Sequence, residues 1–332
     1  MTAPSASRVR VARFGGPEVL SLDEFSPGRP PRRKVRVQVT HASVGSTDAA
    51  ARSGDYLLQP RPGFTPGYDF VGMLETVTPA ATRRGLRPGM RVTGCLARMG
   101  SYTTVLDVPA DRVVPVPDEL DSARAATLPL DLVTAALTIE LAQLPKGATV
   151  FTQGVSGSIG ALLTQYAVAH QMRVIGTASE RTRGFAEALG AAVVDYRDPN
   201  WPALVLDLVP GGADAGVDHT GGAEVRTVTA RSGTVVRTAW SGGRGAAARG
   251  GLLANVRRFA APRERLCSVP LLVASRPAKY RRILQDQLAK VRDGALTGPE
   301  VTVVPFSDVV DAHRALASLA PGHKVVLKMA GR

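Results

Sequence analysis

Three glycines at regular spacing are the residues with the clearest chemical meaning in this chain. They form the pattern Gly154-x-x-Gly157-x-x-Gly160, with a strand-like apolar run before it and a helix-like run after it. In that context one glycine permits a tight turn, the next lets a diphosphate approach the backbone, and the last lets helix and strand pack closely. The pattern therefore predicts dinucleotide binding, with the diphosphate at the N-terminus of the helix. The alternative is a glycine-rich turn in a cofactor-free α/β domain.

The end of the next strand indicates which dinucleotide is bound. A carboxylate about 20 residues after the first glycine would bond the ribose hydroxyls of NAD. This chain instead reads GTAS at 176–179, followed by Glu180, Arg181, Thr182 and Arg183. Guanidinium and hydroxyl groups suit a 2′-phosphate, which a carboxylate would repel. We therefore predict NADPH rather than NADH, with Glu180 as counter-evidence. In the alternative interpretation both arginines are ordinary surface residues of a helix.

Alternating helix-like and strand-like runs surround this turn and would position it. After Asp121 we expect helices at 122–142, 157–170, 181–189 and 277–293, and strands at 148–152, 173–177, 192–195, 214–218 and 234–238. That alternation predicts an α/β fold, a Rossmann-type doubly wound parallel sheet with helices on both faces. Two segments depart from it: 241–265 is predicted to be a mobile excursion over the sheet edge, and 266–273 a further strand.

The first 110 or so residues have a different character, with short strands punctuated by glycine and proline. Lys34–His41 alternates apolar and polar residues, as a half-buried strand does. The tail, a helix at 308–319 and a strand at 324–328, is predicted to pack back on this region. The predicted domains are therefore a discontinuous catalytic domain, residues 1–124 and 275–332, and a dinucleotide-binding domain, residues 125–274.

Composition limits the class of protein. The 332 residues are 44% hydrophobic, which is ordinary for a globular protein with a core, and include only two cysteines, Cys95 and Cys267. Two isolated cysteines provide no disulfide framework, so a reducing compartment is expected. The start, MTAPSASRVRV, has no apolar signal-peptide core, and no apolar run approaches the roughly 20 residues of a membrane span. These features predict a cytoplasmic protein without a membrane partner.

The net charge of +13 is concentrated in one region. Between Arg226 and Arg282 the sequence is rich in arginine, and Glu264 is its single acid. One interpretation is an arginine-rich solvated surface; the other is a field that attracts an acidic partner or a phosphorylated substrate. The chain has no helix-turn-helix, aromatic platform or zinc module, so no specific nucleic-acid recognition is expected.

Taken together, these motifs resemble the zinc-free quinone oxidoreductase branch of the medium-chain dehydrogenases/reductases, and are similar to polyketide-type enoyl reductases. The resemblance rests on the order and spacing of short stretches that run nearly end to end. Besides the glycine turn they are GPEVL at 16–20, RSGDY at 52–56, PGYDFVG at 66–72, PGMRV at 88–92, LPL at 128–130, Thr134-Ala135, LGA at 189–191, DYR at 195–197, Gly221-Gly222 and GHKVVL at 322–327.

The resemblance implies a barrel-like, mainly β, GroES-like catalytic domain completed by the C-terminus, with a Rossmann domain between its parts. It also implies hydride transfer from NADPH to a quinone or an electron-poor alkene, and a homodimer formed through the sheet edge at 266–273. Zinc-dependent relatives have His-Glu where this chain has Tyr68-Asp69. Because the two cysteines and five histidines are scattered, we predict no metal site.

The same resemblance assigns roles to individual residues. The 2′-phosphate is assigned to Ser179, Arg183 and Tyr196, although Tyr196 also fits a surface aromatic. The remaining predicted cofactor-binding residues are Thr134, Gly154, Ser156, Gly157, Ser158, Ile159, Gly160, His219, Ala239, Trp240 and Ser241. Among these, Thr134 and the run 239–241 are assigned to the nicotinamide end, and His219 is interpreted as a packing residue rather than a general base.

Reduction of an activated double bond also requires a proton. Tyr56 is the candidate acid, since a phenol near an electropositive cofactor site can donate a proton if its pKa falls. Solvent is the alternative donor. One family feature is missing: relatives usually have an asparagine where this chain has Gly45, and Ser46 or Thr47 are the candidate substitutes for it.

Three functions fit these observations. The first is an NADPH-dependent reductase of a quinone or an α,β-unsaturated carbonyl compound, with a small-molecule substrate that is acidic or carrier-linked if the arginine-rich segment takes part. The second is a biosynthetic ketone or enoyl reductase acting on a substrate linked to CoA or a carrier protein, or on a polyketide. The third is a catalytically weak binding protein with an acidic partner such as RNA.

Overall fold

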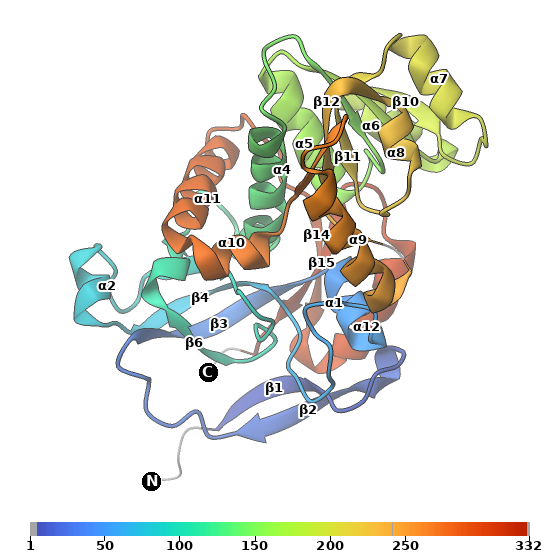
Figure 1. Cartoon of the computed structure of the whole chain (residues 1–332). Coiled ribbons are helices and arrows are strands. Elements are labelled where there is room, and N and C mark those ends of the chain that lie inside the picture. The colour runs from blue at the N-terminus through green and yellow to red at the C-terminus, as the bar shows by residue number, and fades with distance from the viewer. Residues whose placement is uncertain (1–4, 241, 331–332) are drawn as a thin grey trace. The chain divides into compact units, whose positions relative to one another are not determined.

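The structure is a computed structural model that describes residues 5–240 and 242–330 (Figure 1). It divides into two compact units. The first unit comprises the residues up to Val133, Val269–Asp293 and the residues from Gly298 onward. The second comprises Thr134–Ser268 and Gly294–Thr297. None of the helices in these described residues is long and apolar enough to cross a membrane.

The second unit is built on a six-stranded parallel sheet in the order β10-β9-β8-β11-β12-β13. Its strands are β8 (Thr149–Thr152), β9 (Arg173–Ala178), β10 (Ala191–Asp195), β11 (Ala213–Asp218), β12 (Thr229–Arg237) and β13 (Arg263–Leu266). Continuous apolar runs suit strands that are buried on both faces. Phe151, for example, is fully buried and stacks on Trp201 with ring centroids 5.4 Å apart. The predicted doubly wound sheet is confirmed.

Helices cover both faces of this sheet, as Figure 1 shows. They are α5 (Ser158–Ala169), α6 (Glu180–Ala188), α7 (Trp201–Leu208), α8 (Glu224–Thr227) and the larger part of α4 (Leu128–Ala142), while α9 (Gly243–Arg257) contacts edge strand β13. The chain passes from β8 outward to β9 and β10, and then returns to β11 on the other side of β8. This reversal creates a switch point at the carboxyl ends of β8 and β11, where open α/β sheets bind their ligands.

Two predicted elements at the edge of this sheet were wrong. The segment 241–265, predicted as a mobile excursion, contains helix α9 and strand β13. The strand predicted at 266–273 is instead the end of β13 followed by helix α10 (Val269–Ser275). A short apolar run such as this one fits a strand and a buried helix equally well by pattern. Pro270 is compatible with the helix because it lies in its first turn.

The first unit is mainly β. A seven-stranded sheet runs in the order β14-β15-β3-β4-β5-β7, with β6 paired to β3, and β1 and β2 form a separate antiparallel pair. The strands are β1 (Ala6–Val11), β2 (Leu20–Phe25), β3 (Lys34–Val44), β4 (Asp69–Thr76), β5 (Arg91–Cys95), β6 (Val105–Pro109), β7 (Val114–Pro115), β14 (Glu300–Pro305) and β15 (His323–Lys328). Its helices are α1 (Ser46–Ser53), α2 (Pro79–Arg83), α3 (Ser122–Ala126), α10, α11 (Pro277–Arg292) and α12 (Val309–Ala315).

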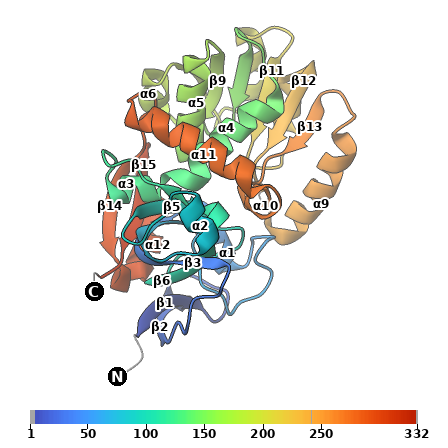
Figure 2. The ribbon, with the colours of Figure 1, turned by 90° about the vertical axis from the view of Figure 1, so that its left-hand side faces the viewer.

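The C-terminus completes the sheet of the first unit. Strand β15 pairs antiparallel with β3, and β14 pairs parallel with β15, so the last strands of the chain extend the sheet formed by the first ones (Figure 2). Val325, Val326 and Leu327 of β15 are fully buried. The predicted return of the tail to the N-terminal region is therefore confirmed. The helix predicted at 122–142 is two helices, α3 and α4, separated at Thr127.

Candidate functional site

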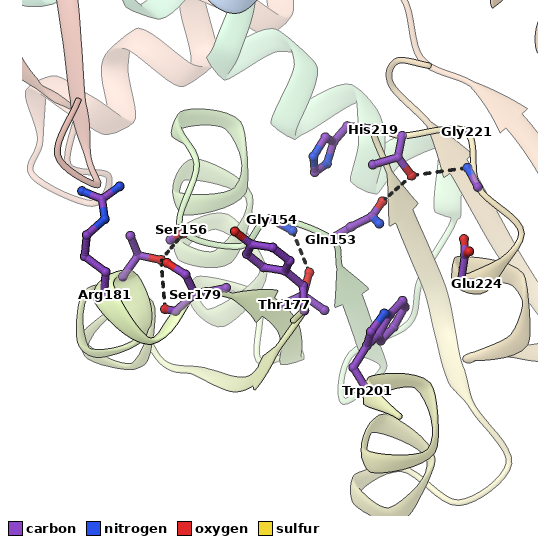
Figure 3. A pocket seen from close by; sticks show the side chains of 15 residues that line it. Gln153, Gly154, Ser156, Thr177, Ser179, Arg181, Trp201, His219, Gly221 and Glu224 are labelled. Atoms are coloured by element: carbon purple, nitrogen blue, oxygen red, sulfur yellow. Dashed lines mark hydrogen bonds between the residues drawn. The ribbon is translucent and has the colours of Figure 1, made fainter. Parts of the chain in front are cut away.

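A cavity of about 810 Å³ lies at the carboxyl ends of the parallel strands of the second unit (Figure 3). Its lining comes from the ends of four strands and the starts of three helices: Gln153, Gly154 and Ser156 after β8; Thr177 to Thr182 except Glu180 around the end of β9; Tyr196 after β10; His219 to Gly222 after β11; and Trp201 and Glu224. Residues from both sides of the switch point thus meet in one cavity.

The glycine turn has the geometry that its sequence predicts. Gly154 has φ of +65°, in the left-handed region, and its N–H donates to Thr177 Oγ1 at 3.1 Å. A β-carbon on Gly154 would lie 2.7 Å from His219 Cε1, and one on Gly160 would lie 2.5 Å from the carbonyl oxygen of Gly154. Both positions therefore require glycine.

The second glycine of the pattern is constrained differently. Gly157 has φ of −72° and is the N-cap residue of α5, where it offers no side chain to cap the helix. A β-carbon there would meet only Gly154 O, at 3.3 Å. A side chain at 157 would therefore press only on that one backbone oxygen, and glycine leaves the start of α5 open to a ligand that approaches the backbone. Ser158 and Ile159 lie in the first turn of α5 and do not line the cavity.

Hydroxyl groups and one guanidinium gather beside the turn. Thr182 Oγ1 lies 3.0 Å from Ser156 Oγ and 3.1 Å from Ser179 Oγ, which links the glycine turn to the end of β9. Arg181 lies at the left end of the cavity in Figure 3. Such a group of hydroxyls with a cation is suited to a phosphate.

Arg183, the arginine that the resemblance assigned to the 2′-phosphate, does not line the cavity. Its Nε donates to Glu180 at 3.0 Å, and its Nη1 lies 3.5 Å from Glu187 and donates to the Val193 carbonyl oxygen at 2.7 Å. The hydrogen bond from Arg183 to Glu180 raises the pKa of the guanidinium. The acids stand three residues before and four residues after it on α6, the spacing at which helical side chains pair. The spacing of these acids was the signal in the sequence that Arg183 would be paired along its own helix, which leaves Arg181 as the candidate for the phosphate.

The other predicted residues divide into two groups. Tyr196 and His219 line the cavity, and Tyr196 is 53% exposed, with the Arg197 guanidinium 5.8 Å from its ring centroid. Thr134 is buried in α4 and is not part of the lining. The structure also keeps Ala239 and Trp240 out of the lining, and Ser241 lies outside the described residues.

His219 has the features of a packing residue. Its imidazole lies so close to the glycine turn that Cε1 would be 2.7 Å from any β-carbon added to Gly154. Burial lowers the pKa of His219, with the charge of Asp218 opposing the shift. The lowered pKa favours the neutral ring, and the close approach to Gly154 is the observation that supports a packing role.

Several lining residues were not predicted from the sequence. Gln153, Thr220 and the pair Gly221-Gly222 come from the ends of β8 and β11, and Thr220 Oγ1 bonds Gln153 Oε1 at 3.1 Å. The polar-and-glycine run after Asp218 is a turn signal that could have identified the last three of them. Trp201 and Glu224 have no such local signal, because their places depend on how α7 and α8 pack.

Tyr56, the candidate acid, belongs to the first unit. Its hydroxyl lies 3.1 Å from that of Tyr68, and the two rings meet edge to face. Burial raises the pKa of Tyr56 to about 12, although the bond to Tyr68 opposes the shift. The change is opposite to the fall in pKa that an acid role was expected to need.

Gly45, which stands where relatives have asparagine, is not required by the backbone of this chain. It is the N-cap residue of α1 with φ of −133°, an extended conformation open to any residue, and a β-carbon there would meet only Asp48 Oδ2, at 3.7 Å. Ser46 and Thr47 are the first residues of α1. Asp48 caps the helix by accepting from the Gly45 N–H at 2.9 Å, and also from the Gly67 N–H at 3.0 Å.

Asp69 lies where zinc-dependent relatives have a ligand, and here it is a buried carboxyl that accepts from the Leu130 N–H at 3.1 Å. Burial raises the pKa of Asp69 to about 8, with Lys324 opposing the shift and Asp131 adding to it. Within residues 5–240 and 242–330 no three His, Cys, Asp or Glu side chains are grouped so as to hold a metal ion. Cys95 and Cys267 are both buried, one in each unit.

The raised pKa of Asp69 predicts a dependence of stability on pH. An unfolded aspartate ionises near pH 4, so between about pH 4 and 8 the unfolded chain releases a proton that the folded chain keeps. Stability is therefore lost as the pH rises toward 8, by up to about 1.4 kcal/mol per pH unit. We expect Asp69→Asn to be more stable than the wild type at pH 8 by a larger margin than at pH 6, in urea unfolding. A margin that does not change with pH would contradict this, and Asp311→Asn, on an exposed carboxyl, is the control.

Comparison with known proteins agrees with this architecture. Residues 31–118 match the family described as "Alcohol dehydrogenase GroES-like domain". A quinone oxidoreductase of Pseudomonas aeruginosa is 32% identical over 212 residues, which are 62% of this chain and 63% of the relative, so the matched region spans less than two thirds of that protein. A phenolphthiocerol/phthiocerol polyketide synthase polypeptide of Mycobacterium tuberculosis is 27% identical over 98% of this chain and 15% of its own length.

A solved structure shows the same fold over the whole chain. The quinone oxidoreductase of Escherichia coli, complexed with NADPH, superposes with a TM-score of 0.82 and covers 97% of this chain and 99% of its own, at 20% identity. Glycine turn, parallel sheet, GroES-like unit and these similarities lead to one assignment. The chain contains an alcohol dehydrogenase GroES-like domain, is similar in sequence to quinone oxidoreductases of the medium-chain dehydrogenase/reductase type and to a polyketide synthase, and has the fold of a solved quinone oxidoreductase.

Proposed function

We propose that this protein is an NADPH-dependent reductase of quinones or α,β-unsaturated carbonyl compounds, and that it needs no zinc. The observation that carries the proposal is the cavity at the switch point, which is lined by Gly154 of the glycine turn, a hydroxyl cluster and the Arg181 guanidinium. The similarity to quinone oxidoreductases supports the reaction class.

The residues present fit NADPH. Gly154 and Gly160 keep the turn compact, and the absence of a side chain at Gly157 leaves room for a diphosphate at the start of α5. Ser179, Thr182 and Arg181 would hold the 2′-phosphate. Glu180 is turned toward Arg183 and so leaves that phosphate without a facing carboxylate from the strand end. When bound, the cofactor supplies a hydride.

We assign the proton of the reaction to solvent rather than to Tyr56. Because its pKa is raised to about 12, the phenol remains protonated at neutral pH but is a poor proton donor. Its bond to Tyr68 holds the ring in a fixed orientation, which suits a hydrogen-bonding group at the edge of a substrate site.

We propose zinc independence because Asp69 and Cys95, two side chains of ligand type in this region, are in states that do not favour binding zinc. The carboxyl of Asp69 is committed to the Leu130 N–H and lies in the field of Asp131 and Lys324. Cys95 is fully buried, and burial raises the pKa of its thiol well above the ordinary value, so the thiolate that zinc prefers is disfavoured.

A second candidate function is favoured by one comparison. The polyketide synthase matches nearly the entire chain, whereas the quinone oxidoreductase match covers 62% of it. The second candidate is therefore a reductase of an enoyl group carried as a thioester.

An assay of cofactor oxidation tests both candidates. The purified protein is mixed with NADPH and, in separate reactions, with a para-quinone, an enone, an enoyl thioester and a simple ketone, each with and without a chelator. We expect turnover of the quinone or the enone that is unaffected by the chelator; strong preference for the thioester would favour the second candidate. Loss of turnover on chelation with recovery on adding zinc, or no turnover of any acceptor, would contradict the proposal.

The two arginines of α6 give a specific prediction for cofactor preference. Arg181→Ala should weaken NADPH binding by about 10- to 100-fold and leave NADH binding unchanged, because a hydrogen bond to a charged group contributes about 1.5–3 kcal/mol. Arg183→Ala is the matched control, since its guanidinium is engaged by Glu180 and Glu187, and should change the NADPH affinity less than about threefold. The measurement is a fluorescence titration with each cofactor. Loss of preference in Arg183→Ala but not in Arg181→Ala would reverse the assignment.

We also propose that the protein is a homodimer joined through β13. This strand is the edge of the six-stranded sheet, where unpaired backbone groups favour pairing with another strand. The proposed contact is Arg263–Leu266 rather than 266–273, since α10 occupies most of the latter. Light scattering would report twice the chain mass for the dimer and the single chain mass if the proposal is wrong.

A further inference from the structure

A buried ion network lies behind the cavity, at the ends of three adjacent parallel strands. Asp218 ends β11, Arg237 ends β12 and Glu264 lies in β13. Their exposed fractions are 0%, 3% and 1%, so all three charges are removed from water. Charges buried this deeply are retained only where partners compensate them.

The carboxylate of Asp218 organises a segment that lines the cavity. Its Oδ1 accepts from the Thr220 N–H at 2.8 Å and from the Thr220 hydroxyl at 3.0 Å, and its Oδ2 accepts from the Gly221 N–H at 3.0 Å. Gly221 has φ of +79°, so the segment turns sharply here. Through these hydrogen bonds Asp218 fixes the conformation of the turn Thr220–Gly222. The same turn also contacts Gln153 through the Thr220 hydroxyl.

Arg237 contacts this turn directly at Gly222 and indirectly through Asp218. Its Nη1 donates to the Asp218 carboxylate and to the Gly222 carbonyl oxygen, the latter at 2.8 Å. The Glu264 carboxylate binds the same guanidinium with both oxygens, accepting from Nε at 3.2 Å and from Nη2 at 3.2 Å. Burial disfavours the charge on Arg237, but the carboxylates of Glu264 and Asp218 raise its pKa nonetheless, so the guanidinium stays charged.

We infer that Arg237 is a positioning residue that holds the Thr220–Gly222 turn in the shape that receives the cofactor, and that Glu264 of edge strand β13 orients it. The identity of the ligand rests on the proposed function, whereas the positioning of the turn by Arg237 rests on the contacts given above. Glu264 also receives Arg226 Nη1 at 2.6 Å and lies 3.4 Å from Arg257 Nη1 of α9. The network therefore links the edge strand and α9 to the wall of the cavity.

The shape of the guanidinium explains why arginine occupies position 237. The three groups that it joins, Asp218, Gly222 O and Glu264, lie on different sides of one planar fork, which a lysine ammonium on a single flexible stem cannot bridge together. Lysine keeps the charge, so Asp218 and Glu264 are not left as unpaired buried charges. Arg237→Lys therefore removes the positioning while sparing most of the fold.

Arg226→Lys provides the matched control. Arg226 contacts the same Glu264 but also the carbonyl oxygens of Ala261 and Pro262, and makes none of the contacts to the Thr220–Gly222 turn. We expect Arg237→Lys to raise the NADPH dissociation constant about tenfold, with Arg226→Lys within about twofold of wild type, even where both lower the melting temperature similarly. Glu264→Gln, which loosens Arg237 without touching the turn, should give an intermediate loss of affinity.

Hydrogen exchange of the ligand-free protein tests the positioning of the Thr220–Gly222 turn independently of cofactor binding. The Thr220 and Gly221 amides should exchange faster in Arg237→Lys than in wild type and Arg226→Lys. Faster exchange without NADPH binding by the wild type would mean that the cofactor assignment fails and the positioning role stands. If Arg237→Lys does not fold, Glu264→Gln takes its place in both measurements. Unchanged exchange and unchanged affinity in a folded Arg237→Lys, or an equal loss of affinity in Arg226→Lys, would overturn the inference.

Discussion

Replacing Gly160 with alanine is expected to weaken NADPH binding about 10- to 100-fold. The new methyl group would lie 2.5 Å from the Gly154 carbonyl oxygen and 2.9 Å from Val155 Cα. These are backbone atoms of the turn itself, so the turn must move away from α5 rather than a side chain rotate. Overpacking of this kind costs about 1–3 kcal/mol, and the displaced turn no longer presents its backbone to the diphosphate. Fluorescence titration with NADPH measures the loss.

Two further glycine substitutions make this result interpretable. Gly157→Ala meets only one protein atom, a backbone oxygen at 3.3 Å, so it should lower the melting temperature less than Gly160→Ala does and lose affinity mainly through contact with the ligand. Gly184→Ala, in α6 with nothing within 4 Å of the new β-carbon, should bind NADPH normally and be more stable by roughly 0.5–1 kcal/mol. Normal NADPH affinity in Gly160→Ala would show that the turn does not hold the diphosphate.

Replacing Lys324 with methionine is expected to destabilise the first unit by about 3–5 kcal/mol. Lys324 Nζ donates to Asp131 Oδ2 at 2.7 Å, and both residues are buried, with exposed fractions of 8% and 3%. Removing one partner of a buried pair leaves the other charge in a medium of low polarity, which accounts for the size of the effect. Thermal unfolding should show a fall of roughly 10 °C in melting temperature.

The double variant and an exposed pair test that explanation. Lys324→Met combined with Asp131→Leu removes both charges and should recover most of the lost stability. Arg314→Met breaks an exposed pair, Arg314–Asp311 at 2.9 Å, and should cost no more than about 1 kcal/mol. If the double variant is as unstable as Lys324→Met, packing rather than the unpaired charge is the cause.

The glycine turn shows what could be predicted from sequence. Its function depends on a strand, a turn and a helix that are consecutive in the chain, so residue types and spacing within about 15 positions determine it. The parallel sheet was predictable for the same reason, since each buried strand is a separate apolar run such as the one around Phe151. Gly160 is required by contacts within the turn, with Gly154 O and Val155, whereas the crowding of Gly154 by His219 is a long-range contact.

The choice between Arg181 and Arg183 shows where a resemblance and the local helix geometry favour different residues. The resemblance assigned the phosphate to Arg183 because of its position in the family motif. In this chain, however, Arg183 forms ion pairs with Glu180 and Glu187 of its own helix. The helical spacing of these charges was visible in the sequence and favours Arg181. The Arg181→Ala and Arg183→Ala titrations decide between the two arginines.

Other features could not be predicted because they depend on long-range packing. The run 266–273 is apolar enough for a strand or a helix, and only its surroundings decide. The network of Asp218, Arg237 and Glu264 joins residues 46 positions apart on three strands whose order cannot be read from one sequence. Trp201 and Glu224 reach the cavity for the same reason, through the placement of α7 and α8.

Titration of the wild-type protein with NADPH and with NADH, followed by nicotinamide fluorescence, tests the central claim most directly. The account predicts saturable binding of NADPH and binding of NADH that is at least about tenfold weaker, because the proposed role of Arg181 is to bind the 2′-phosphate, which NADH lacks. Binding of neither cofactor, or equal binding of both, would contradict it.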